Sequence, residues 1–149
     1  MNSFFALILF FGASTSFAQN SCPDASGQFR GSCIEVSSCH PSRGVRYGAN
    51  IQQRGCSEIE MSFVASSGKK VLFKVDEKNE IFHGGHVLIN TFVTYSGDDL
   101  VRIEKHGNNE FVEVLRKIQK DGEDFLQVDL AGTTGKCTVS TSCLLPSVK

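Results

Sequence analysis

Short runs rich in Val, Ile, Phe and Thr alternate with clusters of Gly, Asn, Asp and Ser from residue 27 to residue 142. This alternation is typical of β-strands joined by tight turns, whereas no long stretch carries a capped helical stripe. The pattern predicts an all-β fold, an antiparallel up-and-down meander that closes as a small barrel of eight to nine strands. The expected strands cover 27–36, 45–54, 57–65, 70–76, 86–95, 100–106, 110–119, 124–131 and 136–142.

An apolar run precedes this pattern at the N-terminus. It extends from Phe4 to Phe11, far short of the roughly 20 residues that a membrane-spanning helix requires. Ser16 and Ala18 place small residues where a signal peptidase cleaves, so residues 1–18 are predicted to be a secretory signal removed after Ala18. The remaining residues, 19–149, are expected to form one β-barrel domain without a membrane anchor, secreted or periplasmic.

Six cysteines follow the predicted signal, and an even number in an exported chain predicts disulfide bonds. Four lie in a cysteine-rich N-terminal part, residues 22–56, and two lie near the C-terminus. Spacing leaves the pairing open between a cross-linked N-terminal part with a Cys137–Cys143 bridge and a pair that ties the termini together. The spacings are too wide for a zinc knuckle. The six residues are Cys22, Cys33, Cys39, Cys56, Cys137 and Cys143.

The remaining composition argues against several classes of function. Lys and Arg number 15 against 16 Asp and Glu, a balance that gives no basis for a nucleic-acid or anionic-membrane partner. No nucleophile elbow, phosphate-binding loop or zinc-protease helix is present, so we expect a non-enzymatic protein without a cofactor. His83 and His86 flank two glycines and are weak candidates for metal ligands, but a turn that enters a strand explains the same residues.

The hairpins of the second half determine which side chains face the barrel interior. We predict a two-residue turn at Asn108-Asn109 and a three-residue loop over 121–123. Together they gather the apolar residues on one face and leave Arg102, Glu104 and Glu113 on the other. This register points Arg116 inward, where it binds a ligand carboxylate or caps the barrel end. The predicted inner face holds Val101, Ile103, Val112, Val114, Ile118, Leu126, Val128 and Leu130.

The residues Ser26-Gly27-Gln28-Phe29-Arg30-Gly31 resemble the G-x-W start of lipocalin-type and avidin-like (calycin) barrels, with Phe29 in place of Trp. The resemblance extends over roughly residues 26–142 and implies a cup-shaped site for a small apolar or amphipathic ligand. Arg116 is then similar to the basic residue that packs on this aromatic late in the barrel. The ligand-binding residues implied are Arg116, Phe29, Val101, Ile103, Val114 and Val128.

A second segment suggests an alternative function. Ser66-Ser67-Gly68-Lys69-Lys70 is similar to the Ser-Gly-x-Lys loop of periplasmic lysozyme inhibitors. That resemblance implies a secreted hydrolase as protein partner, whose acidic cleft would receive Ser67, Gly68, Lys69 and Lys70. A plain hairpin turn explains the same residues. A roomy barrel interior from which Arg116 is accessible favours ligand binding, and a filled interior with a protruding Ser67–Lys70 tip favours inhibition.

Overall fold

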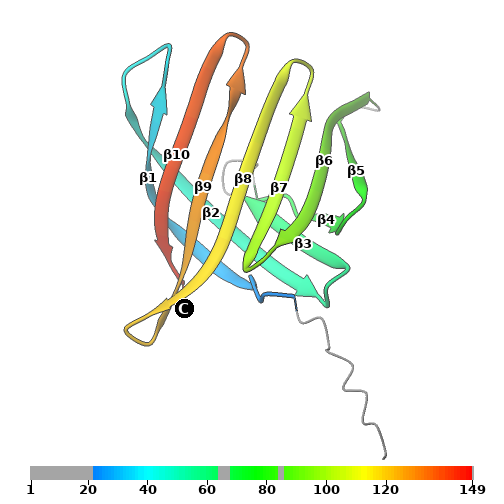
Figure 1. The fold of residues 1–149 in the computed structure, drawn as a ribbon, viewed down its shortest axis with the longest axis vertical. Helices are drawn as coiled ribbons and strands as arrows, with labels where there is room; N and C mark the ends of the chain where they lie inside the picture. Colours follow the sequence, from blue (N-terminus) through cyan, green and yellow to red (C-terminus); the bar gives the residue numbers. More distant parts are fainter. Residues whose placement is uncertain (1–21, 64–67, 84–85, 149) are drawn as a thin grey trace, which may run out of the picture.

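The computed structural model describes residues 22–63, 68–83 and 86–148, and these residues form ten antiparallel strands in one sheet (Figure 1). The prediction of an all-β meander is confirmed, with slightly more strands than the eight to nine expected. No helix in these ranges is long and apolar enough to span a membrane. The strands are β1 (Gly27–Ser37), β2 (Arg43–Arg54), β3 (Glu58–Phe63), β4 (Val71–Lys74), β5 (Lys78–His83), β6 (His86–Ser96), β7 (Asp99–His106), β8 (Asn109–Lys120), β9 (Glu123–Thr134) and β10 (Cys137–Pro146).

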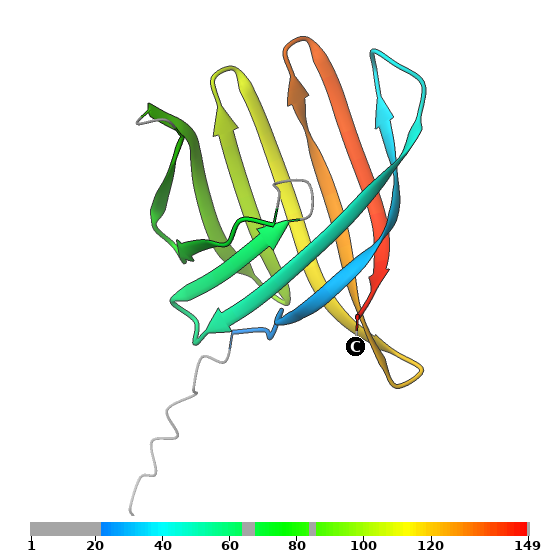
Figure 2. The same ribbon diagram turned by 180° about the vertical axis from the view of Figure 1, so that it is seen from behind.

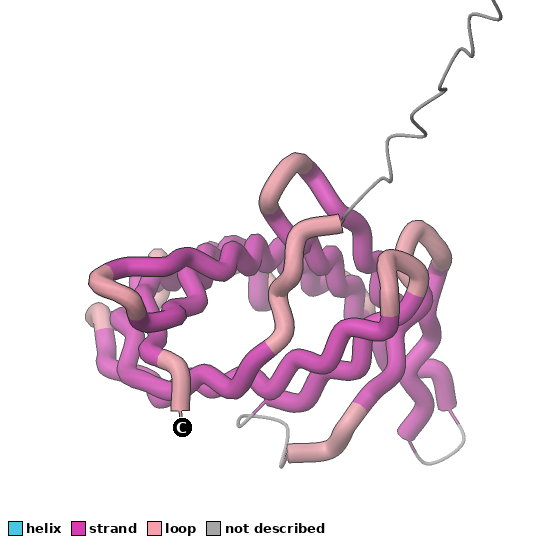
Figure 3. Tube along the Cα trace, turned by 90° about the horizontal axis from the view of Figure 1, so that it is seen from below, coloured by secondary structure: helices cyan, strands magenta, loops and turns pink. Residues whose placement is uncertain are grey.

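The sheet curls into a nearly closed barrel. Consecutive strands pair except for β4 and β5, and β1 also pairs with β10, so β4 and β5 are the two edges of the sheet. The barrel closes where the chain just after β4 contacts β6, the strand next to the β5 edge. There Val75 bridges to Val93, and the Asp76 N–H donates to the Val93 carbonyl at 2.7 Å. Figure 2 shows the crossing of the two sides of the sheet from behind, and Figure 3 shows the oval outline from one end. Such closure leaves little exposed strand edge.

Strand β5 is the element that the sequence pattern does not reveal. Lys78–His83 begins with three polar residues and lies between the expected strands 70–76 and 86–95, where no strand was predicted. The turn before this strand is held by the Asn79 side chain, which accepts the Lys74 N–H at 2.8 Å and donates to the carbonyls of Lys74 and Glu77, each at 2.9 Å. One amide side chain thus satisfies the backbone of this turn and frees the following residues to form a strand.

One half of the barrel interior is filled with apolar side chains. It is the half at which β1, β3, β7 and β9 begin and β10 ends. The segment 22–26 crosses this end of the barrel (Figure 3), buries Ala25 there, and is held by the Cys22–Cys56 disulfide to the turn between β2 and β3. This end is therefore closed. The filling residues are Phe29, Ile51, Ile59, Val93, Leu100, Leu115, Leu126, Val128 and Leu145.

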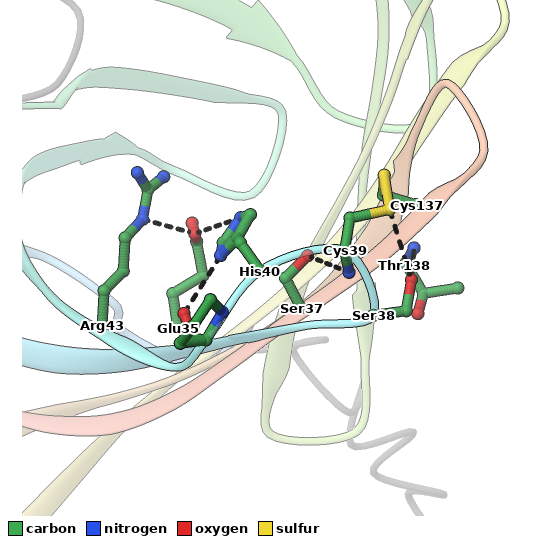
Figure 4. Close-up of polar contacts among 9 residues, drawn as sticks. Glu35, Ser37, Ser38, Cys39, His40, Arg43, Cys137 and Thr138 are labelled. Carbon is green, nitrogen blue, oxygen red and sulfur yellow. Dashed lines mark hydrogen bonds and ion pairs between the residues drawn. A yellow bond between two sulfur atoms is a disulfide. The ribbon is translucent and has the colours of Figure 1, made fainter.

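All six cysteines are paired, as Cys22–Cys56, Cys33–Cys143 and Cys39–Cys137. The expected Cys137–Cys143 bridge is wrong, and the alternative, a tie between the termini, occurs twice. Cys137 and Cys143 lie on the same strand, roughly 20 Å apart, whereas adjacent β1 and β10 bring the observed partners within 5.2 and 5.6 Å between Cα atoms. Figure 4 shows Cys39–Cys137 beside the hydrogen bonds of Ser38 to the Thr138 backbone.

The register of two hairpins differs from the prediction. The turn between β7 and β8 is Gly107-Asn108, with His106 opposite Asn109. The three-residue loop between β8 and β9 is wrong: Lys120 pairs with Glu123 around a two-residue turn in which Asp121 and Gly122 have φ of 55° and 80°. Asp-Gly is a favoured pair for this turn type, which needs positive φ at both residues. The slip of one residue reverses the faces of β7 and β8 relative to β9.

Candidate functional site

The other half of the barrel interior contains a cavity of about 370 Å³. Strands β2 to β9 all contribute side chains to its wall, so the closed sheet itself shapes the site. Its volume lies within the range typical of small-molecule pockets. The interior is thus roomy in this half, which meets one of the two conditions for ligand binding, whereas Arg116 is not among the residues that line the cavity. The apolar lining consists of Met61, Phe63, Val71, Phe73, Ile81, Ile89 and Leu130.

A connected polar cluster forms the remaining wall. The Glu113 side chain is 2% exposed, accepts a short hydrogen bond from the Tyr47 hydroxyl, and accepts the Arg102 Nε–H at 2.8 Å. Arg102 Nη1 donates to Glu104 at 2.6 Å, and its guanidinium lies 4.4 Å from the centre of the Phe63 ring. Burial of a carboxylate is costly unless it is paired and hydrogen-bonded, and Glu113 satisfies both conditions.

Strand pairing places these groups together. Arg102 on β7 lies directly opposite Glu113 on β8, and Glu104 is two residues further along β7, hence on the same face. The predicted register has all three on the outer face, because it gathers the apolar residues of β7 and β8 inside. The Asp121-Gly122 dipeptide is the sequence signal that could have predicted their inward position. This dipeptide favours a two-residue turn, and with that turn Glu113 lies on the inner face together with the apolar residues of β9.

Burial and the neighbouring charges alter the ionisation of the cluster. Burial disfavours the charged form of Arg102, but the adjacent Glu113 and Glu104 carboxylates outweigh it and leave its pKa raised. Burial, together with the nearby Glu113 charge, raises the pKa of Tyr47 far above its usual range. At neutral pH Arg102 is therefore a cation and Tyr47 a neutral hydrogen-bond donor.

We expect neither of the two tyrosines to ionise near pH 10 in the folded protein. Burial, with a smaller contribution from Asp24, raises the pKa of Tyr95 to about 12, and Tyr47 lies higher still. Because unfolded tyrosines titrate near pH 10, the native state retains protons that the unfolded state loses, and stability should fall as pH rises from about 10 to 12. Phenolate absorbance in a chain without Trp measures this directly, and phenolate that appears at pH 10 before unfolding would contradict it.

The structure places the residues predicted to bind ligand elsewhere. Arg116 is exposed on the outer face, where its Nε and Nη2 atoms donate to Asp99 at 2.6 and 2.8 Å, so its predicted inward position is wrong. The β8 register is the reason. Val101, Ile103 and Val114 alternate with the inward residues of β7 and β8 and therefore lie on the outer face. Phe29 and Val128 are inside, but in the filled half rather than on the cavity wall.

A shallower groove of about 520 Å³ lies on the outer face of the sheet. Ile34 and Val36 border it and are 58% and 50% exposed, and Val114 lies on its other side. Its charged member, Asp129, is hydrogen-bonded to Ser142 and Gln127. The groove thus lacks the buried charged cluster that distinguishes the cavity.

The other candidate residues that the structure describes lie beside the turns of the barrel. Lys70 forms an ion pair with Glu60 at 2.9 Å, and Lys69 is exposed at the margin of the cavity. Gly68 is described, whereas Ser67 lies outside the described residues. His83 and His86 are register partners at the ends of β5 and β6. Within the described residues no group of three or more His, Cys, Asp or Glu could hold a metal ion.

Fold and cavity together define a class, a small up-and-down antiparallel barrel with an internal cavity. Among solved structures, the chain is similar to fatty-acid-binding protein 1 of Echinococcus granulosus, with 8% identity, a TM-score of 0.50, and coverage of 83% of this chain and 97% of that one. It is also similar to a fatty-acid-binding protein from Drosophila melanogaster brain (12% identity, TM-score 0.46, coverage 80% and 100%) and to human cRBP IV (17%, 0.45, 80% and 96%).

The neighbour from Echinococcus granulosus is named as a fatty-acid-binding protein, and its likeness supports the barrel fold expected from the sequence without identifying a lipocalin. The likeness concerns the fold. No family model matches the sequence, and no curated protein matches it.

Proposed function

We propose that this protein is a non-enzymatic binding protein that holds a small amphipathic ligand inside its barrel. The observation that carries the proposal is the cavity of about 370 Å³, apolar over most of its wall with a buried polar cluster on one side. Such a combination buries an apolar chain and orients its polar end. Solved barrels of the same fold that are named as fatty-acid-binding proteins support this proposal.

We also propose that the protein is exported after loss of residues 1–18. The three disulfides support this, because such bonds persist in oxidising compartments and are rare in the cytosol. The denatured mass of protein from an exporting host should correspond to residues 19–149 less six hydrogens. A mass that retains residues 1–18 would contradict the proposal.

Binding of Nile red, a neutral apolar dye, tests the cavity. Val71 lines the cavity and Val114 lies on the outer face, so Val71→Trp and Val114→Trp form a matched pair of enlargements. We expect saturable dye binding by the natural chain and a loss of affinity of at least about tenfold in Val71→Trp, equivalent to about 1.4 kcal/mol, because the indole occupies the site. Val114→Trp should bind as the natural chain does.

Two results would count against the cavity as the site. If the natural chain binds no dye and carries no ligand on native mass spectrometry, the proposed function fails. If Val114→Trp loses binding and Val71→Trp keeps it, the ligand lies in the outer groove.

A further inference from the structure

The charge balance of the cavity wall carries information about the polar end of the ligand. The buried cluster contains one guanidinium, Arg102, and two carboxylates, Glu113 and Glu104, whose side chains are 14%, 2% and 21% exposed. Lys69 also lines the cavity but is exposed at its margin, where solvent and salt screen its charge. The interior part of the wall therefore carries a net negative charge.

The cation in this wall is already engaged. Arg102 donates through Nε to Glu113 and through Nη1 to Glu104, and one face of its guanidinium is covered by Phe63. A ligand carboxylate that approached Arg102 would come to rest beside two carboxylates in a poorly hydrated site. Like charges so placed repel each other more strongly than they would in water, because the effective dielectric constant of protein interiors is lower.

Two acceptors in the same region have spare capacity. Both Glu113 oxygens are occupied, one by Tyr47 and one by Arg102, but Glu104 uses only Oε2 in the contacts of the described residues. Thr91 lies opposite Glu104 in the pairing of β6 with β7, is 1% exposed, and has no hydrogen-bond partner for its Oγ1 within the described residues. A buried hydroxyl without a partner has a hydrogen bond to offer to a water molecule or a ligand; Thr91 does not itself line the cavity, but its register partner Glu104 does.

We propose that the cavity selects an amphiphile whose polar end is a cation or a neutral hydrogen-bond donor, held by Glu104 with Thr91 beside it, and that it discriminates against carboxylates. An ammonium group would neutralise the excess negative charge and donate to Glu104, and a hydroxyl would donate without adding charge. This inference rests on the proposed function, since it names the class of ligand for the same cavity.

Competition for bound Nile red by three ligands with the same alkyl chain tests the selection. Dodecylamine, dodecanol and dodecanoate are compared at pH 7, below their micelle concentrations. We expect dodecylamine to bind at least about tenfold more tightly than dodecanoate, with dodecanol between them. Glu104→Gln should reduce this ratio to within about threefold, since it removes the excess charge and leaves Arg102 partly free.

Glu110→Gln is the matched control, because Glu110 is also paired across β7 and β8, with Lys105 at 3.0 Å, but is exposed. It should leave the ratio unchanged, and thermal melts verify that both variants fold. Dodecanoate binding as tight as that of dodecylamine would overturn the selection while the cavity remains a binding site. An equal change in Glu110→Gln, or none in Glu104→Gln, would overturn the role of Glu104. Failure of all three ligands to displace the dye would count against the proposed function itself.

Discussion

Replacement of Arg102 by Met should lower the free energy of unfolding by about 3–5 kcal/mol. Met fills much of the same volume, so the principal loss is the charge that faces Glu113, whose side chain is only 2% exposed. Without Arg102 a buried carboxylate keeps the Tyr47 hydrogen bond but has no cation to balance it. Urea denaturation followed by circular dichroism measures the effect, which is a large share of the stability of an ordinary domain.

Arg116→Met provides the matched control. Arg116 also pairs with a carboxylate across neighbouring strands, Asp99, but the pair is on the outer face and the arginine side chain is 48% exposed. Its loss should cost no more than about 1 kcal/mol. Adding Glu113→Leu to Arg102→Met should recover part of the stability, because the buried charge is then gone. Equal losses in the two arginine variants would show that Arg102 is not the structural centre of the cluster.

Removal of both bridges between β1 and β10 should destabilise the protein by more than the sum of the two single removals. Cys33–Cys143 and Cys39–Cys137 close loops of 110 and 98 residues that largely coincide. With one bridge intact, the other closes only a small additional ring, worth roughly 3 kcal/mol; the last bridge closes a loop of about 100 residues, worth roughly 4.7 kcal/mol. The double removal should therefore cost roughly 8 kcal/mol.

The measurement uses Cys33→Ala/Cys143→Ala, Cys39→Ala/Cys137→Ala and the variant that combines them, each denatured with urea under non-reducing conditions. The Cys22–Cys56 disulfide remains in all three variants and keeps the closed end of the barrel cross-linked. A combined loss equal to the sum of the single losses would contradict the shared-loop argument.

The positions of the turns show how far local sequence can predict this fold. Gly, Asn and Asp clusters located most of the hairpins, because positive φ and side chain–backbone bonds are properties of a few adjacent residues. The β5 strand was not predicted because the turn before it depends on one residue, Asn79, whose side chain hydrogen-bonds to the backbone of Lys74 five positions earlier. A strand with polar residues at its start gives no alternating pattern to detect.

The polar residues of the candidate site were not predicted from local sequence patterns. The predicted register has Arg116 as the one arginine inside an apolar barrel, whereas the structure has Arg116 outside and Arg102 inside. The error is a slip of one residue at 121–122, which exchanges the two faces of β8 relative to β9. The prediction chose the register that puts the most apolar residues on one face. That criterion gave the wrong register because β7 and β8 place Val101, Val112 and Val114 outside and a charged cluster inside.

The sequence by itself determined the all-β class, the up-and-down order and the expectation that every cysteine forms a disulfide, because these follow from alternation, turn residues and an even cysteine number. The tertiary structure alone decided which cysteines pair, since only the closure of β1 on β10 brings Cys33 to Cys143 and Cys39 to Cys137. It also decided the polarity of the cavity. A buried charge is stable only beside its partners. Glu113 has Arg102 on the adjacent strand β7, and Tyr47 on β2, which is distant in the chain and reaches Glu113 only because the sheet closes into a barrel.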